Sequence, residues 1–176
     1  IYLDFSGYTD IALGMARFMG IRLPENFRAP YLKSNLTRFW DNWHITLTQW
    51  MRAYFFFPVT RFLRNRARWM PAWLVILVTQ LSTMVLIGLW HGITMNFLLW
   101  GAWHGLGLFV QNRWSAGTQH LAARWQAKTG LSRAIHVLNT LLTFIYVTLG
   151  WVWFTLPEPG LSTRVLVRLF GFGGGL

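Results

Sequence analysis

The residue of this chain best suited to chemistry is His91, which ends an apolar run in the segment Gly88-Leu89-Trp90-His91-Gly92. An imidazole has an unperturbed pKa of about 6.5, so it can accept and release a proton near neutral pH. A charged group at membrane depth is costly, and a dry apolar pocket favours the neutral ring, which is the form that acts as a base. The residues therefore predict proton transfer at His91 or, as the alternative, a structural hydrogen bond to a neighbouring helix.

The other four histidines carry a weaker signal. His44 lies among tryptophans on the aromatic face of a segment, and His104 lies in a helix rich in small residues, so the residues alone favour a packing role for both. His120 and His136 lie beside predicted loops, where no special role is expected.

Several kinds of site are excluded by what the sequence lacks. There is no cysteine, the five acidic residues are scattered, and no two histidines stand four residues apart as in a helical zinc site. Neither a Gly-x-Ser-x-Gly turn nor a phosphate-binding loop is present. The sequence predicts no bound metal and no bound cofactor.

The composition predicts a membrane protein. The chain is 54% hydrophobic and only 12% charged, and its 12 tryptophans and 5 tyrosines suit ring edges at the level of lipid headgroups. The net charge of +11 is interleaved with aromatic and aliphatic residues, with no basic tail or nucleic-acid motif. Cytoplasmic loops explain this charge better than a nucleic-acid partner, and membrane lipids are the expected surroundings.

Three uncharged segments are long enough to approach the roughly 20 residues that cross a bilayer, namely 73–90, 93–112 and 135–154. Residues 1–20 are more polar and give a weaker fourth span, suited to a helix packed inside a bundle. Basic residues flank the first two spans at their outer ends: Arg61, Arg64, Arg66, Arg68, Arg113, Arg124, Lys128 and Arg133. If these spans form a hairpin, both clusters are cytoplasmic and His91 lies toward the far side.

The predicted fold is therefore all-α, a polytopic integral membrane helical bundle. Residues 36–57 contain no proline or glycine, and their aromatic residues recur at steps of three and four. This pattern predicts an amphipathic or partial-span helix. Residues 155–176 predict a Pro/Gly turn followed by a short amphipathic helix. No repeat or soluble domain is visible, and we interpret residues 1–176 as a single membrane-embedded fragment of a longer protein.

A series of motifs gives the chain a resemblance to a known family. In order, these are Tyr2-Leu3-Asp4-Phe5-Ser6-Gly7-Tyr8-Thr9-Asp10, Gly20-Ile21-Arg22-Leu23-Pro24-Glu25-Asn26-Phe27, Pro30-Tyr31, Phe39-Trp40, Trp43-His44-Ile45, Gly88-Leu89-Trp90-His91-Gly92 and Trp100-Gly101-Ala102-Trp103-His104-Gly105. They resemble the membrane-bound O-acyltransferase (MBOAT) family, and more narrowly its bacterial branch of alginate O-acetyltransferases and D-alanyl transfer proteins.

The resemblance implies a multi-pass enzyme of the bacterial inner membrane. It would carry an acyl group, acetyl in preference, from a thioester donor to a hydroxyl of an extracytoplasmic polysaccharide or other cell-envelope acceptor, as in alginate O-acetylation. The co-substrate would be acyl-CoA or an acyl carrier protein, and the basic clusters would attract such an acidic partner. An extracytoplasmic acyl-transfer protein is a second expected partner.

The resemblance also implies roles for two residues. His91 matches the histidine regarded as catalytic in the family, and His44 matches a second histidine that is widely shared. We expect His91 to act as the general base and His44 to orient the acceptor or stabilise the developing oxyanion. The expected substrate-binding residues are Trp90, Asn96, Trp100 and His104.

The segment after Phe39-Trp40 departs from the pattern of the bacterial branch. Asp41-Asn42 replaces two arginines, Arg52-Ala53-Tyr54 replaces Arg-Asp-Tyr, and Pro58-Val59-Thr60 replaces a Pro-Leu-Gly-Gly turn. Two other functions stay open beside acyl transfer: export of a lipid or glycan with His91 as a lining residue, and a non-catalytic scaffold in a polysaccharide assembly.

Overall fold

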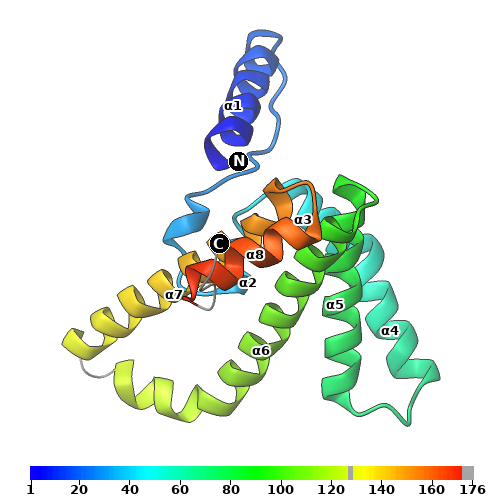
Figure 1. Cartoon of the computed structure of the whole chain (residues 1–176), viewed down its shortest axis with the longest axis vertical. Coiled ribbons are helices and arrows are strands. Elements are labelled where there is room, and N and C mark those ends of the chain that lie inside the picture. The colour runs from blue at the N-terminus through cyan, green and yellow to red at the C-terminus, as the bar shows by residue number, and fades with distance from the viewer. Residues whose placement is uncertain (127–128, 172–176) are drawn as a thin grey trace.

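The computed structural model describes residues 1–171 apart from 127–128, and Figure 1 shows its arrangement. The side chains of residues 119–129 are also outside this description, and with them those of His120, Arg124 and Lys128. The helices in chain order are α1 (Tyr2–Phe18), a 3₁₀ turn (Pro30–Leu32), α2 (Leu36–Trp40), α3 (Ile45–Met51), a π-helical turn (Arg52–Phe56), α4 (Phe57–Arg66), α5 (Ala72–His91), α6 (Met95–Gln126), α7 (Thr129–Thr155) and α8 (Pro159–Leu169). The predicted all-α fold is confirmed, since no strand occurs in the described ranges.

The most extensive helix packing joins α5 to α6, and glycines make it possible. A Cβ atom at Gly88 would collide with the Phe97 carbonyl oxygen, and one at Gly101 with the Met84 carbonyl oxygen. Small residues let the two backbones approach closely where no side chain would fit between them. This contact fixes the connection between α5 and α6, where His91 lies.

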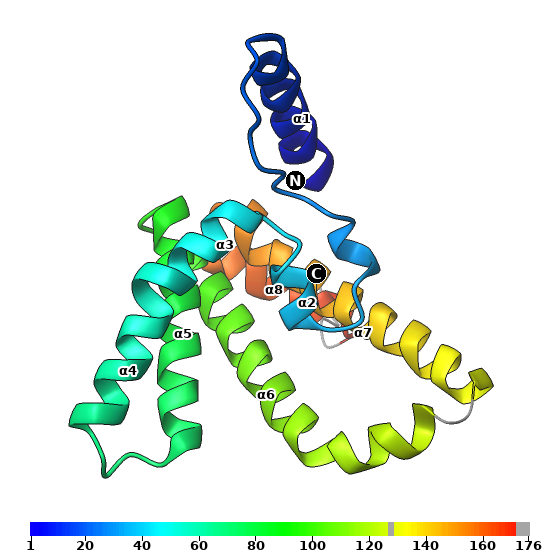
Figure 2. The ribbon, with the colours of Figure 1, turned by 180° about the vertical axis from the view of Figure 1, so that it is seen from behind.

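Helix α7 is held to α6 by a reciprocal pair of side chains. Trp103 Nε1 donates to the Tyr146 carbonyl at 3.1 Å, and the Tyr146 hydroxyl donates back to the Trp103 carbonyl. The two rings stack with centroids 4.7 Å apart. In both views α6 and α7 separate away from this junction, and the far part of α6 bends back toward the start of α7 (Figures 1 and 2).

Two helices are long and apolar enough to cross a membrane, α5 over Ala72–His91 and α7 over Gly130–Thr155. They contain the predicted spans 73–90 and 135–154. Residues 95–112 of the predicted span 93–112 lie in α6, a longer helix that is not one of these two. The predicted segment 1–20 forms α1, and its crossing of the membrane stays a prediction.

The basic clusters lie at one end of the molecule. The α4–α5 connection and the end of the molecule where α6 joins α7 lie away from α1, whereas the α5–α6 connection is at the other end of α5, on the side of α1 (Figures 1 and 2). Arg64 and Arg68 flank the first connection, and Arg113 and Arg133 lie toward the second. His91 therefore lies away from the basic end, as the hairpin predicts.

The prediction of one helix over residues 36–57 is wrong. Helix α2 ends at Trp40, and α3 begins at Ile45, because His44 adopts a left-handed backbone conformation with φ of 42°. A π-helical turn then separates α3 from α4. The break turns the aromatic residues of α2 inward, where Phe39 and Trp40 are buried, and leaves Trp50 exposed.

The core forms where α2 meets α5, α6 and α7. It consists of large apolar and aromatic side chains, namely Leu36, Phe39, Trp40, Trp43, Met51, Met84, Ile87, Trp100, Val147 and Trp151. Trp151 also donates a 2.9 Å hydrogen bond to the Tyr31 hydroxyl, which ties the 3₁₀ turn to α7. Helix α1 protrudes from this core and contacts it through its first turns, where Tyr2 and Phe5 pack on Phe27 (Figure 1).

The predicted C-terminal helix is present as α8, after a turn at Pro157. Asn96 at the start of α6 holds this region in place, because its side-chain amide donates to the Leu156 carbonyl and lies 3.5 Å from the Ser162 hydroxyl. Asn96 and Ser162 are both buried. The start of α6 is thus tied to the end of α7 and to α8.

Candidate active site

His91 is the last residue of α5, and aromatic rings from three helices surround it. Its ring centroid lies 4.9 Å from those of Trp90 and Phe154, 5.6 Å from Trp100 and 6.0 Å from Phe97. The imidazole is half-buried. It therefore combines a largely apolar setting with access from outside, which a base that meets a substrate requires.

The helix ends directly after His91, where the backbone of Gly92 is extended with φ of 168° and ψ of 147°. A Cβ atom at Gly92 would lie 2.7 Å from the Phe97 ring, so this ring packs directly on the glycine backbone. Phe97 in turn stacks on the His91 imidazole at an interplanar angle of 29°. The Trp-His-Gly sequence thus places the imidazole between the end of α5 and the start of α6.

His44 lies at the N-terminus of α3 in a conformation that is uncommon for a residue with a side chain, with φ of 42° and ψ of 55°. Strained backbone of this kind is often found at functional sites and requires support from its surroundings. The ring lies 4.8 Å from Phe5 and 6.0 Å from Trp90. Its Nδ1 atom is buried and has no partner within the described residues.

Hydrogen bonds from the 19–30 connector hold the turn that contains His44. The Asn26 carbonyl accepts from Ile45 N at 3.0 Å, and the Asn26 side-chain oxygen accepts from Thr46 N at 3.2 Å and from the Thr46 hydroxyl at 2.7 Å. Phe27 and Trp43 form an antiparallel bridge on the other side of the turn. These contacts fix Ile45 and Thr46, which follow His44, and Trp43, which precedes it.

The structure brings the two predicted catalytic histidines to the same tryptophan. The Trp90 ring centroid is 4.9 Å from that of His91 and 6.0 Å from that of His44. Burial lowers the pKa of the His44 imidazole from its ordinary value, so the neutral ring is favoured near pH 7.

The four predicted substrate-binding residues lie in different settings. Trp90 is exposed beside both histidines, and Trp100 is buried against His91 with its indole N–H lacking a partner in the described part of the chain. The Asn96 amide group is used by the fold, as described above. Of the four predicted residues, the two tryptophans are the ones whose rings pack on His91.

His104 lies deeper, on the other side of Trp100. Its ring centroid is 5.1 Å from Trp100 and 5.2 Å from Trp40, and it is fully buried. Gly150 of α7 leaves room for the ring, since a Cβ atom there would lie 2.8 Å from His104 Nε2. This setting agrees with the packing role that the small residues around His104 indicate, and its binding role stays a prediction.

Three contributors to the site were not predicted. Phe97, six residues after His91, and Phe154, from the distant helix α7, pack on His91, and Asn26 supports His44 from another segment. Of these three residues, Asn26 alone gave a signal in the sequence. A polar residue that accepts hydrogen bonds commonly caps the start of a helix, and Asn26 lies in the connector between Pro24 and Pro30. Among the described residues, no group of three or more acidic or histidine side chains could hold a metal ion.

The sequence is similar to three kinds of curated protein. It is 35% identical over 176 residues to a probable alginate O-acetylase of Pseudomonas aeruginosa, covering 98% of this chain and 30% of the relative. It is 32% identical over 174 residues to a peptidoglycan O-acetyltransferase of Helicobacter pylori, covering 99% and 30%, and 28% identical over 160 residues to a teichoic acid D-alanyltransferase of Bacillus subtilis, covering 88% and 38%. The chain thus spans about a third of the length of these relatives.

The match to a family covers most of the chain. The sequence profile of the membrane-bound O-acyltransferase family matches residues 1–153, a range that includes both histidines and the helices that position them. Family members are membrane proteins, in agreement with the two apolar helices. The chain belongs to the membrane-bound O-acyltransferase family.

Proposed function

We propose that this chain forms the histidine-bearing core of an enzyme that transfers an acyl group, acetyl in preference, from a thioester to a hydroxyl of a cell-envelope polysaccharide. The observation that carries the proposal is the meeting of His91 and His44 at Trp90, at the end of α5 opposite Arg64 and Arg68. The names of the three relatives support the reaction class, since they are a probable alginate O-acetylase, a peptidoglycan O-acetyltransferase and a teichoic acid D-alanyltransferase.

In the proposed reaction, neutral His91 accepts the proton of the acceptor hydroxyl as its oxygen attacks the thioester carbonyl carbon. The new C–O bond forms, the C–S bond breaks, and the imidazolium returns its proton to the leaving thiolate. General base assistance of this kind contributes about 10²- to 10⁴-fold. Further rate enhancement comes from holding both substrates in the reacting geometry.

His44 and the tryptophans assist this step. His44 would orient the acceptor or donate a hydrogen bond to the oxyanion, since its Nδ1 has no partner among the described residues. The unpaired indole N–H of Trp100 lies in the ring that packs on His91 and is a second candidate donor. Trp90, which both histidines contact, would stack on a sugar ring.

The basic end of the molecule supports a role in donor recognition. Arg64, Arg68, Arg113 and Arg133 lie toward it, and an acyl-CoA or an acyl carrier protein brings the opposite charge. Long-range attraction of this kind weakens with salt. Donor and acceptor would then reach His91 from opposite ends, and an extracytoplasmic partner would receive or present the acceptor.

The same charge distribution supports the orientation of the protein. Under the positive-inside rule the basic end faces the cytoplasm, which places the His91 end toward the periplasmic side of a bacterial inner membrane. A multi-pass topology follows if α6 crosses together with α5 and α7. The α5 helix, with 20 residues, is about 30 Å long, which equals the hydrocarbon thickness.

The test is an acyl-transfer assay on the full-length protein with radiolabelled acetyl-CoA or acetyl carrier protein as donor and envelope polysaccharide as acceptor. We expect a base-labile ester on the polysaccharide with the wild-type protein and a loss of about 100-fold or more with His91→Gln. His136→Gln provides the matched control, because His136 is an exposed histidine of α7.

The alternative functions give different results in the same assay. Undiminished transfer by a folded His91→Gln protein would remove the catalytic role of His91. Absence of ester formation with either donor, together with transport of a lipid or glycan across a proteoliposome membrane, would favour export.

A further inference from the structure

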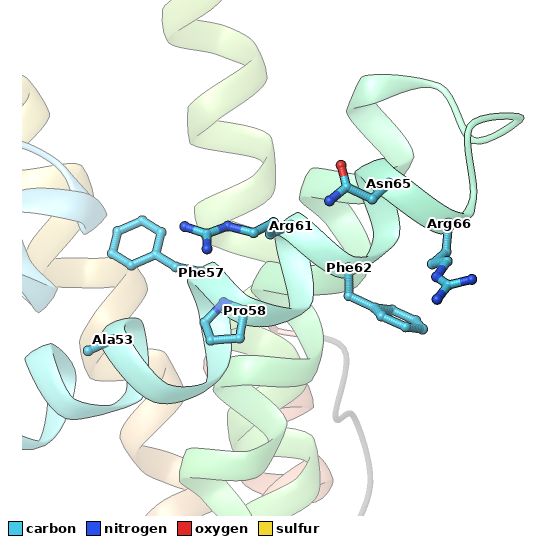
Figure 3. Close-up of a pocket in the computed structure, with 7 residues that line it drawn as sticks. All are labelled: Ala53, Phe57, Pro58, Arg61, Phe62, Asn65 and Arg66. Atoms are coloured by element: carbon cyan, nitrogen blue, oxygen red, sulfur yellow. The ribbon is translucent and has the colours of Figure 1, made fainter.

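The outward face of α4 and of the π-helical turn before it forms a shallow groove that no helix covers in the described part of the chain. The hollow has a volume of about 430 Å³. Its lining combines aromatic, small apolar and basic side chains, namely Ala53, Phe57, Pro58, Arg61, Phe62, Asn65 and Arg66 (Figure 3). The groove contains neither histidine and none of the four arginines proposed above for donor recognition.

The two arginines of the groove have no counter-charge nearby. The sequence contains no acidic residue between Asp41 and Glu158, and Asp41 is already paired with Arg52. No ion pair of Arg61 or Arg66 occurs among the described side chains. Two cationic side chains in one groove favour the binding of an anionic ligand.

The apolar side chains of the groove are exposed although α4 packs on α5. Phe57 is 56% exposed and Phe62 is 62% exposed. Figure 3 shows the Arg61 side chain extending along the helix toward Phe57, with Phe62 and Arg66 at the other end of the groove. A ligand that fills the groove would therefore contact aromatic surface and a guanidinium group together.

The position of the groove along the molecule indicates the level of the lipid headgroups. Trp69 and Trp73, in and just after the α4–α5 connection, are 79% and 47% exposed. Exposed tryptophans are typical of the boundary between hydrocarbon and water. The α5 helix that begins beside them is one of the two helices able to cross a membrane.

We propose that this groove binds an anionic glycerophospholipid. When the lipid binds, the Arg61 and Arg66 side chains, which extend to opposite ends of the groove in Figure 3, turn toward its phosphate. The Asn65 amide donates to the phosphate or to the glycerol oxygens, and an acyl chain runs along Phe57 and Phe62. A soluble phosphate would use the arginines and leave the two phenylalanines in water. A phospholipid satisfies both, which is why the groove favours a lipid.

The test measures lipid retention by the purified full-length protein in native mass spectrometry, with phosphatidylglycerol and phosphatidylcholine offered at equal concentration. We expect phosphatidylglycerol to be retained in preference. An arginine near an anionic lipid contributes about fivefold in affinity, so we expect roughly a 30-fold loss for the Arg61→Gln/Arg66→Gln variant. Each single variant should lose about fivefold and serves if the double variant does not fold.

Two exposed arginines on another amphipathic helix, Arg164 and Arg168 of α8, provide the matched control. Arg164→Gln/Arg168→Gln should leave the preference for phosphatidylglycerol unchanged. Equal losses in the two double variants would show a general charge effect and overturn the proposal, as would full retention in Arg61→Gln/Arg66→Gln.

Two further measurements distinguish a lipid phosphate from a soluble phosphate. Phe62→Ser should weaken retention of phosphatidylglycerol, because the acyl chain loses its aromatic contact. Inorganic phosphate or free CoA that displaces the lipid at equal concentration would identify a site for soluble phosphate and overturn the lipid assignment.

Discussion

The side-chain oxygen of Asn26 accepts two hydrogen bonds from Thr46, one from its backbone N–H at 3.2 Å and one from its hydroxyl at 2.7 Å. Thr46 lies two residues after His44, whose backbone is in the left-handed region. A residue in a separate connector therefore stabilises the turn that holds the His44 ring beside Trp90.

Asn26→Ala should lower kcat by a larger factor than a variant elsewhere in the chain that loses a similar unfolding free energy. The loss of two hydrogen bonds costs about 1–3 kcal/mol of unfolding free energy. A small displacement of His44 should lower kcat about tenfold or more at saturating acceptor. Steady-state kinetics and thermal unfolding of the full-length protein measure the two effects.

A matched control separates positioning from stability. Asn35 caps α2 in a similar way, since its side-chain oxygen accepts from Arg38 N at 2.8 Å, but it does not adjoin His44. Asn35→Ala should cost about 1 kcal/mol of stability and leave kcat near the wild-type value. Asn26→Asp keeps the acceptor oxygens and should retain most of the activity. Equal losses of kcat in Asn26→Ala and Asn35→Ala would rule out the positioning role.

Gly101→Ala should destabilise the protein. A methyl group at Gly101 would collide with the backbone of Met84 in α5, and such overpacking costs about 1–3 kcal/mol. Gly117, also in α6, has open space around it, so Gly117→Ala should raise stability by about 0.5–1 kcal/mol. Thermal unfolding in detergent measures both, and a neutral Gly101→Ala would show that α5 and α6 do not pack this closely.

Periodicity and charge predicted α5 almost to the residue. The uncharged run of residues 73–90 became the helix Ala72–His91, because Pro71 limits it at one end and Gly92 at the other. The side on which His91 lies could also be predicted, since the distribution of arginines needs no knowledge of packing. The Pro/Gly turn and the helix that follows it were predicted for the same local reasons.

The break at His44 could not be predicted from local sequence. A histidine with positive φ gives no compositional signal, and the segment from Leu36 onward has the aromatic spacing of one continuous helix. What fixes the break is Asn26, whose contacts with Ile45 and Thr46 depend on a distant connector. The aromatic ring of Phe154 beside His91 likewise results from packing between α5 and α7, which no short segment encodes.

The activity should depend on pH through His44 as well as His91. Burial lowers the pKa of His44, so its neutral ring should persist below pH 6.5 and become protonated only in more acidic solution. Protonation of His44 should therefore lower kcat/KM only at pH values below the ordinary pKa of histidine. A pH profile of kcat/KM for wild type and His44→Gln tests this, and an acid limb centred above about pH 6.5 that His44→Gln removes would contradict it.

The most direct test of the account is the single-turnover rate of acyl transfer by the full-length protein with His91→Gln, measured with donor and acceptor bound. We predict a rate lower by about 100-fold or more, with acceptor affinity and thermal unfolding close to those of His136→Gln. A rate within about threefold of the His136→Gln protein would contradict the assignment of His91 as the general base.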